Sequence, residues 1–458
     1  MANLASTTID GTITEKRGTS SISGTTITVD MSTGNYFEVS LATASGNIVT
    51  FNVTNVPSAG QVGTFIIKIL QSSTPRTIDW STIAGTIASG NIKWKVTPTI
   101  STARDDIDVY SFTTYDSGAT WFGSVIGQEF KSVSIYGNRG VFCGGDYASS
   151  GQKYGYIASE MDSDKMDYIT IDTNGNATTF GNLGIARGYL SACSDGQRGV
   201  IGGGRVYNDP GTPVESNVID YITIATLGAS TDFGNLTVAR QGLTSTSSPT
   251  RGIFAGGYVN PSPTYYNTID YITIVTPTNA ADFGDMIGSG SEAGSALSQR
   301  SACSDGSRGV LAAGYNGTVR NYIEYISFDH PSNGTNFGTL TSSFRAAAGT
   351  SDGSRGIIAA GTGPPSRNAI DYITIATPGN AGNFGNLTRS HYYISATSNG
   401  SRGVFGGGWT DPVSYPPSNS QQWASKTIDY IDIVSTGNAL DFGDLTSTRD
   451  TLAACSGN

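Results

Sequence analysis

The sequence predicts an all-β protein in which an N-terminal β-sandwich precedes a six-bladed β-propeller. Three elements recur six times in one order: an Arg-Gly pair opening a short apolar run, an acid within a run such as Ile-Asp-Tyr-Ile-Thr-Ile, and a Phe-Gly pair thirteen residues after the acid. The arginines are Arg139, Arg198, Arg251, Arg308, Arg355 and Arg402; the acids are Asp167, Asp220, Asp270, Glu324, Asp371 and Asp429; the phenylalanines are Phe180, Phe233, Phe283, Phe337, Phe384 and Phe442. A fixed count inside a variable period of roughly 50 residues is typical of repeat proteins, and four short strands per repeat favour a propeller.

The length of the chain predicts two domains. The repeats occupy residues 131–458, and residues 1–130 form a separate domain. Only 14% of the residues are charged, whereas 60 are glycine and 23 are tyrosine. This composition suits short strands joined by tight turns and disfavours long helices.

The N-terminal domain shows the alternation of apolar and polar residues that half-buried strands require. The alternating runs are Thr25–Asp30, Tyr36–Leu41, Ile48–Val53 and Thr64–Ile69. Several such runs separated by Gly, Asn and Ser predict a β-sandwich. Its tryptophans are expected in the core rather than on a ligand-binding surface: Trp80, Trp94 and Trp121.

Each repeat is expected to form one antiparallel sheet of four strands, A to D in chain order. In repeat two the predicted strands are Leu190–Cys193, Arg198–Gly204, Ile219–Ile224 and Phe233–Leu236. Neither face of strand C is purely polar. A sheet that is buried on both faces, between two neighbouring sheets, is therefore predicted.

The repeated arginine and acid are interpreted as parts of the scaffold. Arg198 lies at the start of strand B and Asp220 at the start of strand C. Because these strands run antiparallel, the two residues lie at opposite ends of the sheet and should not pair with each other. We expect the acid to accept backbone N–H groups near the glycines that follow strand B, and the arginine to donate to carbonyls of the A–B or C–D turns. A ring of six catalytic arginines or acids is the alternative, and repetition in every repeat favours the scaffold.

The segment Leu452–Ser456 resembles a strand A that is not followed by a strand B. We expect it to complete the sheet of repeat one beside Val141–Cys143, which would close the circle of sheets and remove its free edges. Ser132–Gly137 also resembles a strand A and competes for the same position.

Variation in length is concentrated between strands B and C. The interval from arginine to acid is 28, 22, 19, 16, 16 and 27 residues in repeats one to six. A D–A segment connects strand D of one repeat to strand A of the next. In an antiparallel sheet the B–C loops and the D–A segments lie on the same side, so one side of the propeller is expected to carry the long loops. In a closed circle the long loops of repeats six, one and two are neighbours, and the Gly/Ser-rich D–A stretch Met286–Arg300 lies on the same side.

Aromatic residues in these long loops are the predicted ligand-binding residues. Flat rings beside Asn, Ser, Asp and Gln suit the apolar faces and hydroxyl groups of a sugar, and they also suit a protein contact. Loops that vary in length without any function are the alternative. The candidates are Tyr147, Tyr154, Tyr156, Tyr207, Trp409, Tyr415 and Trp423.

The sequence predicts neither catalysis nor a cofactor, and we assign no catalytic residue and no metal ligand. The two histidines, His330 and His391, belong to no catalytic motif, and Asp162-Ser-Asp164 lacks the rest of a calcium loop. Glycan cleavage by two loop carboxylates stays an alternative. The candidate carboxylates are Asp146, Glu160, Asp209, Glu215 and Asp411.

Charge and hydropathy argue against several partners. The net charge of −10 and the lack of a Lys/Arg run argue against nucleic acid. No apolar run reaches the ~18 residues of a membrane span, and the N-terminal residues do not resemble a secretory signal, so a soluble protein is expected. Cys193, Cys303 and Cys455 fall at one position in different repeats and are not expected to form disulfides with one another.

Three resemblances follow from these residues. An Arg-Gly strand that ends in paired glycines, a tyrosine-bearing strand and an aromatic residue at the start of the fourth strand together resemble the kelch repeat, with Phe where kelch repeats usually have Trp. Repeats such as Arg251–Gly257, Asn267–Ile274 and Ala281–Asp285 resemble those of virion structural proteins of tailed bacteriophages, particularly cyanophages. The close of the N-terminal domain, Asp108–Gly123, resembles a module of phage tail-fibre proteins.

These resemblances imply a virion protein, made in the host cytoplasm and located in a tail fibre or another appendage. The N-terminal domain would bind other virion or tail proteins and would oligomerise, as a trimer. The propeller would act as an adhesin for a glycan or protein receptor on the host. A purely structural or decoration protein and a surface-polysaccharide depolymerase are the alternatives.

Overall fold

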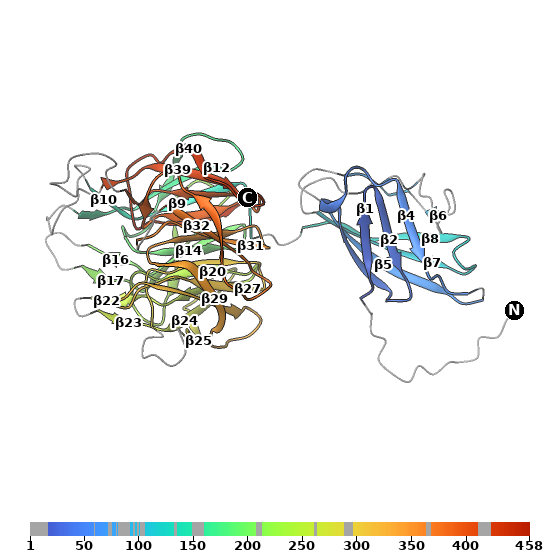
Figure 1. The fold of residues 1–458 in the computed structure, drawn as a ribbon, viewed down its shortest axis with the longest axis horizontal. Helices are drawn as coiled ribbons and strands as arrows, with labels where there is room; N and C mark the ends of the chain where they lie inside the picture. The colour runs from blue at the N-terminus through green and yellow to red at the C-terminus, as the bar shows by residue number, and fades with distance from the viewer. Residues whose placement is uncertain are drawn as a thin grey trace. The chain divides into compact units, whose positions relative to one another are not determined.

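The protein is all-β and consists of two compact units, Met1–Ser132 and Val133–Asn458. In the described residues the 3₁₀ helix η1 (Leu41–Thr43) is the one helical segment, and no helix there is long and apolar enough to cross a membrane. Figure 1 shows the strands of both units. The computed structural model describes residues 17–58, 60–71, 76–78, 80, 92–94, 97–98, 100, 106–131, 135–148, 160–207, 213–260, 263–287, 296–362, 368–410 and 423–458.

Two sheets with a common aromatic core make up the described part of the N-terminal unit. The first sheet has the strand order β1 (Ser20–Ser23), β2 (Thr26–Asp30) and β4 (Thr50–Thr54); the second has β3 (Tyr36–Ser40), β5 (Gly63–Leu70), β7 (Asp106–Thr114), β8 (Trp121–Lys131) and β6 (Ile92–Trp94). Alternate residues of β2 and β3 are buried, as the period of two predicted. Trp80 and Trp121 lie in the core and Trp94 packs against it, so the expectation for the tryptophans is confirmed.

The C-terminal unit contains six four-stranded antiparallel sheets, one for each repeat. In A-to-D order they are β41 (Ala453–Gly457), β9 (Arg139–Cys143), β12 (Lys165–Thr170) and β13 (Thr178–Asn182); β14 (Ser191–Ser194), β15 (Arg198–Gly202), β18 (Val218–Thr223) and β19 (Thr231–Asn235); β20 (Thr244–Ser247), β21 (Arg251–Ala255), β24 (Thr268–Thr273) and β25 (Ala281–Asp285); β26 (Ser301–Ser304), β27 (Arg308–Ala312), β28 (Arg320–Ser327) and β29 (Thr335–Phe344); β30 (Ala348–Ser351), β31 (Arg355–Ala359), β32 (Ala369–Thr374) and β33 (Gly382–Asn386); and β35 (Ser395–Ser398), β36 (Arg402–Gly406), β39 (Thr427–Asp432) and β40 (Leu440–Asp444). The predicted strands of repeat two are confirmed, with ends that differ by one or two residues.

The C-terminal strand completes the sheet of repeat one. β41 pairs antiparallel with β9, and Cys455 lies opposite Val141. The expectation for Leu452–Ser456 is therefore confirmed. The competing segment is used differently: Tyr136 lies against the first strands, and its hydroxyl lies 3.0 Å from the carbonyl oxygen of Ser304 and 3.0 Å from Ser351 Oγ.

Neighbouring sheets are joined by hydrophobic cores in a circular order. Each sheet shares one cluster of buried side chains with the next sheet, from repeats one and two through repeats five and six. Phe142 of repeat one packs in the same cluster as Val404 and Phe442 of repeat six. Burial on both faces explains why strands B and C read as nearly continuous apolar runs.

Two circles of hydrogen bonds connect the first strands of the six sheets. In the backbone circle, six residues with φ between 53° and 63° each donate N–H to the carbonyl of the preceding member, with N···O distances of 2.7–3.0 Å. Its members are Tyr189, Gly242, Gln299, Ala346, Tyr393 and Thr451. In the serine circle, each Oγ donates to the carbonyl of the preceding serine over 2.5–2.7 Å; its members are Ser194, Ser247, Ser304, Ser351, Ser398 and Ser456.

Candidate functional site

All six B–C loops begin on the side where the D–A segments run. In every repeat, a residue just after strand B forms a backbone bridge with the D–A segment that leads into the same repeat. The bridges are Asp146–Asp450, Gly188–Arg205, Gln241–Tyr258, Ser298–Tyr315, Arg345–Thr362 and His391–Thr410. The predicted grouping of B–C loops with D–A segments is confirmed by this pairing.

The longer B–C loops carry small sheets of their own. They occur in repeats one, two, three and six, and the described parts of repeats four and five, where the interval is shortest, have none. β10 (Asp146–Ala148) pairs with β11 (Glu160–Asp162), β16 (Arg205–Val206) with β17 (Val214–Glu215), β22 (Tyr258–Val259) with β23 (Thr264–Tyr265), and β37 (Trp409–Thr410) with β34 (His391–Tyr392) and β38 (Trp423–Ala424). The strands β10, β16, β17, β22 and β23 lie along one side of the C-terminal unit (Figure 1).

Some of the predicted ligand-binding residues lie in these small sheets. Tyr147 in β10, Tyr207 just after β16 and Trp409 in β37 are all half-buried. The ring of Trp409 lies 6.0 Å from that of Tyr392, between ring centroids. Trp423 belongs to β38 and its backbone pairs with Thr410.

The other predicted positions lie outside the described residues: Tyr154, Tyr156 and Tyr415, together with most of the stretch Met286–Arg300.

Carboxylates link the B–C loops of neighbouring repeats. Asp162 in the loop of repeat one accepts the backbone N–H of Tyr207 in the loop of repeat two. In the same relation, Glu215 in the loop of repeat two accepts the N–H of Asn260 in the loop of repeat three over 2.8 Å. The loops of repeats one, two and three are therefore in contact, and the sequence had grouped only repeats six, one and two.

A buried cluster of charges joins the loops of repeats one and two. Arg205 Nη2 lies 2.8 Å from Asp146 Oδ2 and 3.9 Å from Asp162 Oδ1, and the guanidinium stacks over the ring of Tyr189 at 5.0 Å. Burial, followed by the negative charge of Asp146, raises the pKa of Asp162 to about 8. One arginine thus faces two carboxyl groups, of which Asp162 holds its proton near neutral pH.

The raised pKa of Asp162 predicts a stability that falls as pH rises. Because the folded state binds this proton more tightly than the unfolded state, the contribution is complete at pH values below the unfolded pKa near 4 and is lost as pH rises through about 8. We expect the melting temperature of Asp162→Asn to depend less on pH than that of the wild type between about pH 5 and pH 9. Identical pH profiles of the two proteins, measured by differential scanning fluorimetry, would contradict this assignment.

A cavity of about 120 Å³ lies among the starts of the first strands. The six members of the backbone circle line it together with strand A residues such as Ser191, Ser245 and Ser395. The rings of Tyr189 and Tyr393, both half-buried, meet edge to face with centroids 5.4 Å apart. Burial raises the pKa of both phenols, so they stay protonated at neutral pH. We call this space the central cavity.

Sequence reasoning missed the central cavity, although a signal was present. Tyr189, Gly242, Ala346, Tyr393 and Thr451 each stand nine residues after the repeated phenylalanine. A position that varies from glycine to tyrosine within otherwise constant spacing is where repeats differ from one another, and two tyrosines at such a position indicate a surface for binding.

The repeated Arg-Gly arginines reach the next sheet. Arg198 Nη1 donates to the carbonyl of Ile274 over 2.9 Å, at the C–D turn of repeat three, and its guanidinium stacks on Tyr221 at 4.3 Å. Arg402 of repeat six reaches Ile171 of repeat one in the same way, over 3.1 Å. Donation to C–D turn carbonyls is confirmed, with the acceptor in the adjacent repeat.

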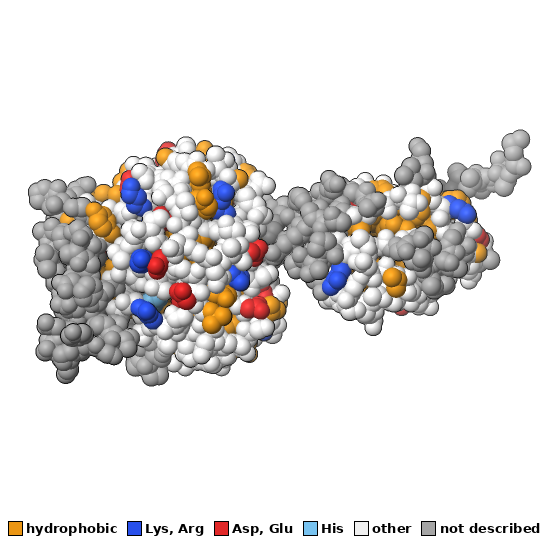
Figure 2. Space-filling model, turned by 90° about the horizontal axis from the view of Figure 1, so that it is seen from above, with side chains coloured by type: hydrophobic (Ala, Val, Ile, Leu, Met, Phe, Trp, Pro, Cys, Tyr) orange, Lys and Arg blue, Asp and Glu red, His pale blue; other side chains and the backbone are white. Residues whose placement is uncertain are grey.

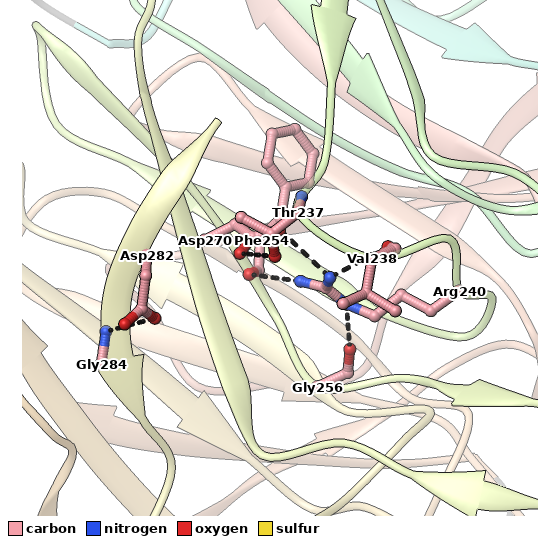
Figure 3. Close-up of polar contacts among 8 residues, drawn as sticks. All are labelled: Thr237, Val238, Arg240, Phe254, Gly256, Asp270, Asp282 and Gly284. Carbon is pink, nitrogen blue, oxygen red and sulfur yellow. Dashed lines mark hydrogen bonds and ion pairs between the residues drawn. The ribbon is translucent and has the colours of Figure 1, made fainter. Parts of the chain in front are cut away.

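The prediction for the repeated acids was wrong about their partners. A β-bulge at the acid in strand C turns its carboxylate toward the D–A segment that leads into the same repeat. Asp270 accepts the backbone N–H and hydroxyl of Thr237, over 3.0 and 2.6 Å, and forms an ion pair of 3.1 Å with Arg240, which also donates to the carbonyls of Gly256 and Phe254 (Figure 3). No pattern in the sequence indicated a fully buried arginine at this place.

Four repeats have this buried ion pair, and the described residues of the other two do not form it. The pairs are Arg187–Asp220, Arg240–Asp270, Arg300–Glu324 and Arg449–Asp167. In repeats five and six, Phe344 and His391 stand where most other D–A segments have arginine, seven residues after the repeated phenylalanine. Their acids, Asp371 and Asp429, are held by the N–H and hydroxyl groups of threonines.

No described group of three or more His, Cys, Asp or Glu side chains is arranged to hold a metal ion. The four cysteines are buried free thiols. His391 is buried, and this burial lowers its pKa to about 4. On the face drawn in Figure 2, the basic side chains are interspersed with acidic ones rather than gathered into a patch.

Comparison with known proteins did not assign the chain to a family. It matches no protein-family model, and a search of curated proteins found no relative.

Proposed function

We propose that this protein is a virion appendage component that binds a ligand on the host cell surface without catalysis. In this proposal the C-terminal unit is a six-bladed kelch-like β-propeller and the N-terminal unit is a β-sandwich. The circular order of the sheet contacts and the two six-membered hydrogen-bond circles support the propeller. The resemblance to phage repeats supports the location.

One observation carries the binding assignment. The B–C loops that carry small sheets lie on the same side of the unit as the backbone circle, which lines the central cavity. The B–C loops of repeats one, two and three are linked by hydrogen bonds. A uniform scaffold that holds different loops on one side is the usual arrangement of a recognition surface. Half-buried aromatic residues there supply flat contacts with little loss of side-chain entropy.

The N-terminal unit is assigned to attachment. Its own core makes it an independent module, and several large apolar side chains on its strands are exposed, including Phe122, Val125 and Ile126 of β8. Such residues suit contact with other virion proteins or with further copies of the chain, as a trimer. A structural protein without a receptor and a polysaccharide depolymerase remain the competing functions.

Substitution of loop aromatics tests the binding assignment. We expect the Tyr207→Ala/Trp409→Ala double variant to bind host cells at least roughly tenfold more weakly than the wild type, because aromatic anchors dominate recognition interfaces. Binding of the fluorescently labelled full chain to a panel of cyanobacterial cells provides the measurement. Tyr115→Ala, which removes an exposed aromatic side chain from the N-terminal unit, is the matched control and should bind normally.

Three outcomes separate the candidate functions. Equal binding by the double variant and the wild type contradicts the loop assignment. Absence of binding to every strain, with the protein incorporated normally into particles, favours the structural alternative. Release of soluble oligosaccharide from purified surface polysaccharide favours the depolymerase.

A further inference from the structure

The central cavity contains buried polar atoms without a partner in the described part of the chain. Ser395 is 6% exposed and Gln299 is 9% exposed, both line the cavity, and neither Ser395 Oγ nor Gln299 Oε1 has a hydrogen-bond partner. A buried polar group without a partner is destabilising, so such groups call for a ligand or ordered water.

The unpaired Ser395 has a specific cause in the repeat. In repeat two, Ser191 Oγ lies 2.6 Å from Oγ of Ser245, a strand A residue of the next repeat. The residue related to Ser245 in the neighbour of repeat six is Ala454, which has no hydroxyl group. The cavity wall therefore has a free hydroxyl on this side.

Aromatic rings and an amide lie next to each other at the rim of the cavity. Tyr189 and Tyr393 flank Thr451 in the backbone circle, and the side chain of Gln299 forms hydrogen bonds with the hydroxyl groups of Tyr393 and Tyr258. A cavity with aromatic rings and an adjacent amide matches a pyranose, which has an apolar face and outward hydroxyl groups.

We infer that the central cavity binds one neutral sugar residue, with its apolar face against Tyr189 and Tyr393 and its hydroxyl groups bonded to Gln299 and Ser395. This inference rests on the proposed function and names the chemical class and the position of its ligand. The cavity volume of about 120 Å³ suits a small ligand such as one sugar residue. The one charged side chain in the lining, Arg300, is paired with Glu324, so the cavity offers no free charge to an ionic ligand.

Saturation-transfer difference NMR of the full chain with D-galactose, D-glucose and D-mannose tests the inference. We expect at least one hexose to show saturation transfer, and D-galacturonate to show much less. Ala396→Phe, which fills the cavity from strand A of repeat six, should abolish the signal. Gln299→Leu should weaken hexose binding roughly tenfold, and it decides the test if Ala396→Phe does not fold.

The control and the contrary results distinguish this inference from the proposed function. Tyr207→Ala lies outside the cavity lining and should retain the hexose signal. Absence of transfer from all three hexoses, or an unchanged signal in both Ala396→Phe and Gln299→Leu, overturns the inference. If Ala396→Phe and Gln299→Leu retain cell binding and the Tyr207→Ala/Trp409→Ala double variant loses it, the inference about the central cavity is overturned and the loop assignment stands.

Discussion

Deletion of residues 452–458 is expected to prevent the C-terminal unit from folding while leaving the N-terminal unit folded. The deletion removes β41 and exposes the edge of β9, breaks the serine circle at Ser456, and opens two hydrophobic cores, those shared by repeat one with repeats two and six. A typical domain is stable by only about 5–15 kcal/mol, so the loss of a strand from two hydrophobic cores is expected to unfold the unit. The N-terminal unit has a separate core and does not depend on this strand.

Differential scanning calorimetry with limited proteolysis would measure this outcome. The truncated chain should lose the unfolding transition of the C-terminal unit, and proteolysis should leave a fragment of about the first 130 residues. Addition of a synthetic peptide spanning residues 452–458 should restore part of the transition, because the peptide supplies the missing strand β41.

Ser456→Ala is the matched control for the deletion. It removes one member of the serine circle and keeps the strand, so it should cost only about 1 kcal/mol. A truncated chain with both transitions unchanged would show that β41 is dispensable and that the circular contacts are not what stabilises the unit.

The sequence predicted the scaffold because the same residues recur at fixed distances. The thirteen residues from acid to phenylalanine determine strand C, the turn and strand D, and each of the six sheets contains them. The position of β41 followed from the resemblance of Leu452–Ser456 to a strand A. Such local patterns require no knowledge of which sheets are neighbours.

The contacts of the D–A segments and the contacts between distant repeats were not predictable from the same patterns. Arg240 lies in a D–A segment, and a charged loop residue is ordinarily solvated, so nothing in the sequence indicated its complete burial. Its environment depends on the bulge at Asp270 and on the carbonyls of Phe254 and Gly256, at the end of the following strand B. The pairing of Tyr189 with Tyr393 likewise joins residues about 200 positions apart and follows only from the circular order of the sheets.

Arg240→Met is expected to destabilise the C-terminal unit by about 3–5 kcal/mol, because it leaves the carboxylate of Asp270 buried without its cation. The guanidinium also donates to the carbonyls of Phe254 in strand B and of Gly256 just after it, and these would lose this donor. The double variant Arg240→Met/Asp270→Asn should recover much of the loss, since both charges are then absent. Chemical unfolding followed by intrinsic fluorescence provides the free energies.

Repeat five supplies a matched position in which the same acid has no arginine. Asp371 is held by the N–H of Thr341 over 2.8 Å and by its hydroxyl over 2.7 Å, and burial raises its pKa. Asp371→Asn removes a charge that is already costly to bury and retains an oxygen acceptor, so it should change the free energy of unfolding far less than Arg240→Met does. If the two substitutions cost the same, the arginine would contribute packing rather than charge compensation. The expected result is that Arg240→Met lowers the free energy of unfolding more than Asp371→Asn does, and that the double variant recovers the loss. That result would explain why phenylalanine, Phe344, can stand in place of arginine in the D–A segment leading into repeat five: Thr341 satisfies Asp371 there.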